Sequence, residues 1–242
     1  MRRLFGWASG LAMMAAAATA TAAPIELITN GNFETGTFAG WTTNVLGGSN
    51  GNLFIDTPGT PTPQSGLPTI GTAANGAWYA VTDMSGPGTY ALSQAFTLGA
   101  SSSVILRFDM FANDWDGGPF CGNGLNHTLP QSQCGRVDIL SNGAGAFNTG
   151  AGVLANYFMG VDGGPDPHGF TSYLFDITAL VGGGGTFILR FAEVDNQSNF
   201  NLGVDNVSIQ AEAVPEPASL ALLGLGMVAG ARRLRRKVSK IS

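Results

Sequence analysis

The feature that most constrains this chain is the alternation of apolar and polar side chains, residue by residue, in several of its segments. The alternation is clearest in residues 90–98, 104–112 and 186–193. A two-residue period is typical of β-strands that bury one face. Shorter candidate strands, separated by clusters of Gly, Asn, Pro and Asp, are 41–46, 53–56, 78–82, 136–140, 153–159, 171–175 and 203–210.

About ten short strands with glycine-rich turns predict an all-β fold, an antiparallel β-sandwich of the jelly-roll type. The sequence has no heptad repeat and no long apolar stripe at the 3.6-residue helical period. Residues 176–181 are expected to form one helical turn, which the glycines at 182–185 end. We expect the sandwich to span residues 23–213 as one domain.

The charge of the chain is divided unevenly along its length. Residues 23–217 contain three arginines, no lysine and all 16 acidic residues, a formal charge of −13, although the whole chain sums to −5. A domain with so few cations cannot displace many phosphate counterions, which excludes a nucleic-acid binder. Metal cations are the ionic partners that this balance favours.

The N-terminal segment, residues 1–22, has the three parts of a secretory signal peptide. Arg2 and Arg3 precede an apolar stretch at 4–18, and Ala20-Thr21-Ala22 is a small-residue cleavage site. We therefore expect an N-terminal signal helix, export through the inner membrane, and Ala23 as the first residue of the mature protein. A membrane anchor that is retained is the alternative.

The C-terminal segment, residues 214–242, has three parts in a fixed order. Pro215, Glu216 and Pro217 precede an uncharged, mostly apolar stretch at 218–231, and an arginine-rich end at 232–237 follows. The apolar stretch predicts a short transmembrane helix, held with its C-terminus in the cytoplasm by the basic residues. A tail anchor that is never cut would explain the same pattern.

This C-terminal segment resembles the PEP-CTERM sorting signal of bacteria that export polysaccharide. The resemblance implies that a membrane protease-transpeptidase, the exosortase, cuts near the Pro-Glu-Pro. It implies that the protein is anchored transiently in the inner membrane and then passed to the cell surface or the extracellular matrix.

The two ends of the central domain carry a second resemblance. Asn30-Gly31-Asn32-Phe33-Glu34 with Gly40-Trp41 near the start, and the segment 203–209 near the end, are similar to motifs of galactose-binding-like jelly rolls and carbohydrate-binding modules. The resemblance implies a structural Ca²⁺ where the first and last strands meet, held by Glu34 and Asp205 with nearby backbone or Asn oxygens. The alternative is that these two carboxylates cap turns and bind no ion.

Further acidic residues lie in glycine-rich segments. Residues 114–118, Asp-Trp-Asp-Gly-Gly, match half of a calcium loop but lack its later carboxylates. We expect a solvated loop here, and the same for Asp162 and Asp166.

Cys121 and Cys134, the only cysteines, bracket a segment rich in Gly, Asn and Pro. An even cysteine count in an exported chain predicts a disulfide. The alternative is a metal site with His127, although two Cys and one His at this spacing match no zinc pattern.

The three arginines of the domain, Arg107, Arg136 and Arg190, each fall in a candidate strand. Asp109 and Asp138 follow two of them at the i+2 position, so these side chains share a sheet face and can form a charge ladder. The alternative is that the guanidinium groups line a groove that binds glycans.

Trp115 is the best candidate to stack on a sugar ring, because acidic and glycine residues surround it in sequence. It can instead anchor its own loop. Trp41 and Trp78, beside strand starts, are expected in the core.

Catalytic signals are weak. The Gly-x-Ser-x-Gly pattern at 47–51 lacks the helix that should follow it in a hydrolase, and His127 and His168 have no evident partner. We therefore expect a non-enzymatic surface or matrix protein that binds extracellular polysaccharide. The alternatives are a structural matrix or adhesion protein without a saccharide site, and a glycosidase, whose two carboxylates spacing alone cannot identify.

Overall fold

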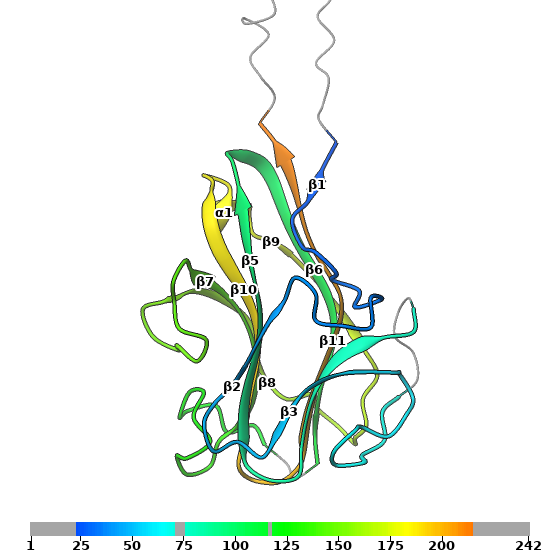
Figure 1. Ribbon diagram of the computed structural model, residues 1–242. Coiled ribbons are helices and arrows are strands. Elements are labelled where there is room, and N and C mark those ends of the chain that lie inside the picture. Colours follow the sequence, from blue (N-terminus) through cyan, green and yellow to red (C-terminus); the bar gives the residue numbers. More distant parts are fainter. Residues whose placement is uncertain (1–22, 71–75, 116–117, 215–242) are drawn as a thin grey trace, which may run out of the picture. The chain divides into compact units, whose positions relative to one another are not determined.

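The computed structural model describes residues 23–70, 76–115 and 118–214. Ala23–Val214 forms one compact unit, a sandwich of two antiparallel β-sheets (Figure 1). This confirms the predicted all-β sandwich. The predicted signal helix, the predicted transmembrane helix and the sorting residues Pro215, Glu216 and Pro217 lie outside the described residues.

Eleven strands and one helical turn make up the described unit. They are β1 (Ile25–Glu26), β2 (Thr42–Val45), β3 (Gly51–Asp56), β4 (Tyr79–Met84), β5 (Gly88–Leu98), β6 (Ser101–Asp114), β7 (Gln133–Ser141), β8 (Val153–Gly160), β9 (Thr171–Asp176), α1 (Thr178–Val181), β10 (Gly185–Asp195) and β11 (Phe200–Ala213). In the first sheet the order is β3-β4-β11-β6-β9, with β1 beside β11; in the second it is β2-β5-β10-β7-β8. From β4 on, the chain changes sheet at most connections, as in a jelly roll.

The two-residue alternation correctly predicts which side chains face the core. On β6, Leu106, Phe108 and Met110 are buried between the sheets, whereas Arg107 lies on the outer face and is exposed. A strand that sends successive side chains to opposite faces can bury its apolar set only in this register. Aromatic rings fill the space between the sheets, where Phe108 contacts Phe191 across the interface.

The two tryptophans expected in the core differ. Trp41 is buried against Phe33 and Phe191, as predicted. Trp78 is 38% exposed, so its prediction is wrong. Trp78 directly precedes β4, and its ring lies near Gly36 in the loop after β1.

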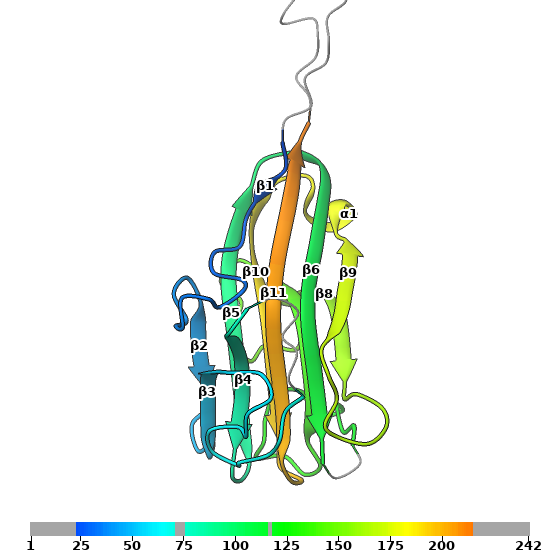
Figure 2. The same ribbon diagram turned by 90° about the vertical axis from the view of Figure 1, so that its right-hand side faces the viewer.

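The two ends of the sandwich differ in what they carry. Ala213 pairs with Ser101 at one end of the β11–β6 ladder, and Phe200 pairs with Asp114 at the other. Ala23 and Val214 therefore lie at one end, here called the terminal pole, and the loops after β6 and β8 lie at the other, the loop pole (Figure 2). A 14-residue strand such as β6 separates the poles by about 45 Å.

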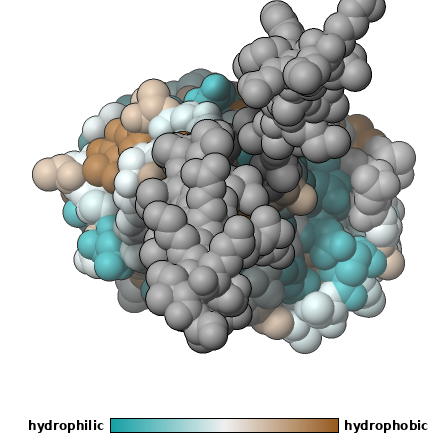
Figure 3. All heavy atoms as spheres, turned by 90° about the horizontal axis from the view of Figure 1, so that it is seen from above, coloured by the Kyte–Doolittle hydropathy of each residue, from teal (hydrophilic) through white to brown (hydrophobic). Residues whose placement is uncertain are grey.

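Figure 3 looks onto the terminal pole and shows hydrophilic side chains gathered to the right of the view. Within 23–70, 76–115 and 118–214, no helix has the length and hydropathy needed to cross a membrane.

Candidate functional site

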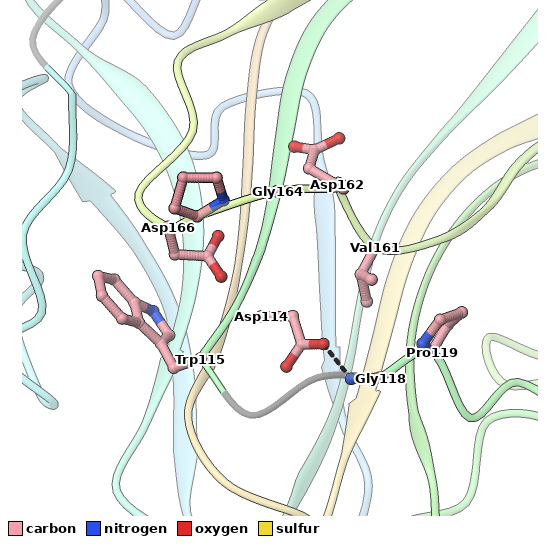
Figure 4. Close-up of a pocket in the computed structure, with 10 residues that line it drawn as sticks. Asp114, Trp115, Gly118, Pro119, Val161, Asp162, Gly164 and Asp166 are labelled. Atoms are coloured by element: carbon pink, nitrogen blue, oxygen red, sulfur yellow. Dashed lines mark hydrogen bonds between the residues drawn. The ribbon is translucent and has the colours of Figure 1, made fainter.

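A pocket of about 480 Å³ opens at the loop pole (Figure 4). One wall comes from the chain that follows β6 and carries Asp114, Trp115 and Pro119. The other wall is the loop between β8 and β9, residues 161–166. The pocket therefore joins two segments that are distant in sequence.

The loop between β8 and β9 is fastened to the end of β6 by hydrogen bonds. The amide of Ala112 donates to Asp162 Oδ2 (2.6 Å), and the amide of Asp162 donates to the Ala112 carbonyl (2.9 Å). Farther along the loop, the amide of His168 donates to Asn113 Oδ1 (2.8 Å). These bonds hold the second wall of the pocket against the sheet.

Asp114 is buried at the base of the pocket, so the predicted solvated loop is wrong at this residue. Its carboxylate accepts hydrogen bonds from the Gly118 amide and from Gln133 Nε2. Gln133 reaches this position because it pairs with Phe120 in an isolated bridge at the start of β7. These donors come from outside the local motif, which is why the sequence around Asp114 did not indicate its burial.

Polar atoms without hydrogen-bond partners in the described structure gather around this pocket. Trp115 Nε1, Asp166 Oδ1 and His168 Nε2 are buried and make no hydrogen bond within 23–70, 76–115 and 118–214. The same holds for the neighbouring atoms Asn113 Nδ2 and Gln133 Oε1. A buried polar atom without a partner costs free energy, so such a group of donors and acceptors indicates that a polar guest completes them.

Among these residues, Asp166 combines a buried carboxylate with charged neighbours on several sides. Its side chain is 7% exposed, and the nearest basic atom is His168 Nε2, 3.8 Å from Oδ1. Burial raises the pKa of Asp166, and the charges of Asp114 and Asp162 act in the same direction, although His168 and a hydrogen bond from the Asp114 backbone amide oppose them. In Figure 4 the Asp166 carboxylate lies near the indole of Trp115, and the Asp114 carboxylate points to the Gly118 amide.

The structure brings Trp115 together with Asp114, Asp162 and Asp166, a grouping that the sequence did not predict. Asp166 and His168 carried no signal beyond their place in a Gly-Pro segment. The pairing of β6 with β9, together with the hydrogen bonds that Ala112 and Asn113 make with the loop before β9, brings these residues beside Trp115.

Two of the three arginines lie on the outer face of the second sheet and are not among the residues that line this pocket. Arg190 and Arg136 both bind Asp138: Arg136 Nη2 lies 2.9 Å from Asp138 Oδ1, and Arg190 Nη2 donates to Oδ2. Arg190 Nη1 also donates to the carbonyls of Ala146 (2.8 Å) and Asn148 (2.7 Å). Arg190 borders a groove of about 250 Å³, but it is fully buried and its nitrogens hold Asp138 and the 142–150 loop.

Arg107 lies on the outer face of the other sheet. It is exposed and borders a shallow groove of about 350 Å³ with Ser172 and Asn206. Its predicted partner, Asp109, instead accepts hydrogen bonds from Ser172 Oγ (2.5 Å) and Asn206 Nδ2 (2.7 Å). The three arginines therefore do not form one surface with Trp115.

Asp205, one of the two predicted calcium ligands, is fully buried on β11 beside a β-bulge. Its Oδ1 accepts a hydrogen bond from the Asn206 amide (2.7 Å), and its Oδ2 has no hydrogen-bond partner in the described residues. The pKa of Asp205 is raised to about 7, chiefly by burial and also by the charges of Asp109 and Glu34, against the hydrogen bond from the Asn206 amide. A buried oxygen between like charges is a position that a cation would stabilise.

Glu34, the other predicted ligand, reaches this region through the loop after β1. The Gly31 carbonyl accepts a hydrogen bond from the Val207 amide (2.8 Å), and any side chain at Gly31 would collide with the Val207 carbonyl. Glu34 Oε1 accepts hydrogen bonds from the amides of Ala77 (2.9 Å) and Trp78 (3.0 Å). Among the residues that the structure describes, no three His, Cys, Asp or Glu side chains form a metal site alone, so calcium here would need carbonyl or amide oxygens as well.

The predicted disulfide is present: Cys121 and Cys134 are joined, with their Cα atoms 5.1 Å apart. His127, the alternative partner, instead contacts Thr89, with Nδ1 3.0 Å from Oγ1. The disulfide ties the loop after β6 to β7, next to Gln133.

Comparison with known families adds information about the end of the chain. Residues 213–237 match the PEP-CTERM protein-sorting motif. β11 ends at Ala213, so the PEP-CTERM motif begins where the sandwich ends. Among curated proteins, none matches this chain.

Several solved structures share features of the sandwich. TmCBM61 in complex with β-1,4-galactotriose is 10% identical, with a TM-score of 0.47 over 76% of this chain and 97% of its own. A cleaved adhesin domain of Lys-gingipain from Porphyromonas gingivalis is 16% identical, with a TM-score of 0.45 over 80% and 99%. A cyclase from Fischerella sp. TAU is 19% identical, with a TM-score of 0.49 over 78% and 98%.

Proposed function

We propose that this protein is an exported, non-catalytic saccharide-binding protein of the cell surface or extracellular matrix, and that the Trp115 pocket is its binding site. The observation that carries the proposal is the group of buried donors and acceptors around an indole ring that have no hydrogen-bond partner among the residues the structure describes. A sugar offers hydroxyl groups that both donate and accept, and an apolar C–H face that stacks on an aromatic ring.

A bound metal ion would account for this pocket less well than a sugar. Asp166 Oδ1 could bind a cation, but the indole Nε1 of Trp115 carries a hydrogen and can only donate. A ligand that both donates and accepts hydrogen bonds can satisfy Asp166 Oδ1 and Trp115 Nε1 together. This reasoning supports a hydroxyl-bearing guest.

The signal peptide expected from residues 1–22 and the PEP-CTERM motif matched at 213–237 support export followed by sorting. In this proposal an exosortase-type protease recognises the C-terminal segment, which anchors the chain transiently in the inner membrane before transfer to the surface. The saccharide partner would then be an extracellular polysaccharide.

We also propose that a structural Ca²⁺ is bound by Asp205 together with Glu34. Asp205 Oδ2 has no hydrogen-bond partner within the described ranges, and this, with the raised pKa of Asp205, supports the assignment. Bound calcium would neutralise the carboxylates where the loop after β1 packs on β11, and so stabilise that junction.

The test of the saccharide proposal is a glycan array probed with the full-length protein and with Trp115→Ala. We expect retention on at least one class of polysaccharide, and loss of that retention in the variant. Retention of no saccharide, or equal retention by the variant, would contradict the proposal.

Trp78→Ala is the matched control, because Trp78 is also partly exposed but lies outside the pocket. It should bind as the unmodified protein does. Incubation with the retained polysaccharide should release no new reducing ends, and their release would overturn the non-catalytic assignment.

A further inference from the structure

The residues that line the Trp115 pocket carry charge of one sign only. Asp114, Asp162 and Asp166 are among the residues that line it, and no lysine or arginine is among them. The carboxylates of Asp114 and Asp162 already accept hydrogen bonds from protein groups, which leaves Asp166 as the carboxylate with an oxygen unsatisfied by the described residues. Arg107, Arg136 and Arg190 all lie elsewhere on the sandwich, as described above. A guest in this pocket therefore meets a negative potential, inside a domain whose formal charge is itself strongly negative.

From this charge we infer that the ligand of the pocket is an amino sugar with a free ammonium group, presented by a polysaccharide that has lost N-acetyl groups. The inference rests on the proposed saccharide site and names its ligand class. It assigns Asp166 as the acceptor for the ammonium group and Trp115 as the platform for the sugar ring.

Asp166 has the placement that this role requires. Its side chain is more than nine-tenths buried, its Oδ1 has no hydrogen-bond partner among the described residues, and it lines the pocket (Figure 4). An ammonium group has three donors and no acceptor, so it can satisfy this oxygen. Water-excluded surroundings strengthen such a charge-assisted hydrogen bond.

Trp115 supplies the second half of the recognition. A cation held beside an indole ring is attracted to the face of that ring, in addition to the stacking of the sugar itself. The Nε1 of Trp115, buried and without a hydrogen-bond partner in the described chain, remains as a donor for a sugar hydroxyl.

The same charges exclude other saccharide classes. A uronic acid, a sulfated sugar or a pyruvylated sugar would place an anion near three carboxylates with no guanidinium in the lining. Like charges brought together in this way oppose binding. A neutral sugar would leave Asp166 Oδ1 with only a hydroxyl donor.

The experiment compares matched glycans before and after chemical de-N-acetylation. Immobilised β-1,4- and β-1,6-linked N-acetylglucosamine polymers, their de-N-acetylated forms, and neutral glucan and galactan are incubated with the full-length protein. We expect the de-N-acetylated forms to bind at least about tenfold more tightly at low salt. This preference should shrink as NaCl rises toward about 0.5 M, because salt screens the charges.

Variants separate a specific site from general attraction between a polycation and an acidic protein. Asp166→Asn should lose about tenfold in affinity for the de-N-acetylated polymers. Glu212→Gln, which removes an exposed carboxylate at the terminal pole, should not. Trp115→Phe should weaken binding to these polymers but leave binding to polylysine, which has no sugar ring, unchanged.

The outcomes distinguish the two proposals. Neutral or acetylated glycans that bind as tightly as the free-amine forms would overturn the amino-sugar assignment and leave the saccharide site standing. Equal losses in Asp166→Asn and Glu212→Gln would reduce the effect to net charge and also overturn it. Binding to no glycan would overturn both proposals. If Asp166→Asn fails to fold, the acetylated and de-N-acetylated comparison on the unmodified protein still decides.

Discussion

Arg190 and Asp138 face each other across β10 and β7, and both side chains are completely buried. Burial alone would raise the pKa of Asp138, but hydrogen bonds and charge from Arg136 and Arg190 lower it below its usual value. Arg190 also holds two carbonyls of the 142–150 loop. This pair therefore fixes a loop to the outer face of the second sheet.

Replacing Asp138 with Asn should destabilise the protein strongly. The change keeps the size of the side chain but leaves the guanidinium of Arg190 buried without its counter-ion, a loss of about 3–5 kcal/mol. Urea unfolding followed by fluorescence measures it. Arg107→Gln, on an exposed arginine with no ion pair in the described residues, is the control and should leave the midpoint unchanged. Similar shifts in both variants would show that Asp138 is not specially placed.

Glu193 should make the stability of the protein depend on pH. It is buried between the sheets, its Oε2 accepts a hydrogen bond from Thr82, and its Oε1 has no hydrogen-bond partner in the described chain. Burial raises its pKa well above the usual value, and the charges of Asp195 and Asp83 raise it further. The folded state therefore retains a proton that the unfolded chain releases, so stability falls as pH rises above the unfolded pKa.

Glu193→Gln removes this ionisation. Relative to the unmodified protein, the variant should gain stability with rising pH, by up to about 1.4 kcal/mol per pH unit between the unfolded and folded pKa values. Urea unfolding of both proteins at several values between about pH 5 and 8 tests this. A stability difference that stays constant over that range would show that Glu193 does not titrate.

The disulfide should stabilise the loop pole. Replacing both Cys121 and Cys134 with Ser should lower the free energy of unfolding by about 3 kcal/mol, since a closed loop of this length restricts the unfolded chain. Thermal unfolding of the double variant should match that of the reduced unmodified protein. If reduction leaves the melting temperature unchanged, the disulfide does not carry this stability.

Calcium should raise the melting temperature by binding only the folded state. Ca²⁺ at about 100 times its dissociation constant adds about 2.7 kcal/mol, or a few degrees for a domain of this size. EDTA should reverse the shift, and Asp205→Asn should abolish it. Asp166→Asn should respond as the unmodified protein does, because Asp166 lies in the pocket at the loop pole. A melt that EDTA does not change would contradict the calcium proposal.

The strands could be predicted because the alternation of apolar and polar side chains is contained in each strand's own sequence. It does not depend on which strands lie beside it in the sheet. β1 was missed because two residues cannot show a period, and its pairing with β11 depends on contacts across the whole chain. Trp78 and Asp114 were placed wrongly for a related reason. The exposure of each is decided by segments far away in sequence, such as Gln133 beside Asp114.

The candidate site could be predicted only in part. Trp115 was identified from its polar neighbours, but Asp166 entered the site only when the loop between β8 and β9 was fastened to β6. For the arginines, spacing predicted that Arg136 and Asp138 share a face, which they do. The spacing gave no indication that the 142–150 loop would cover Arg190.

The long pairing of β11 with β6, which resumes after the bulge beside Asp205, has a mechanical consequence for the surface location proposed above. A load on the chain after Val214 would run along the axis of β11, parallel to its neighbours. The interstrand hydrogen bonds from Ser101 to Asp114 would then resist together in shear instead of opening one after another. If the protein is held at the surface as proposed, a pull at the terminal pole would therefore leave the shape of the opposite pole unchanged.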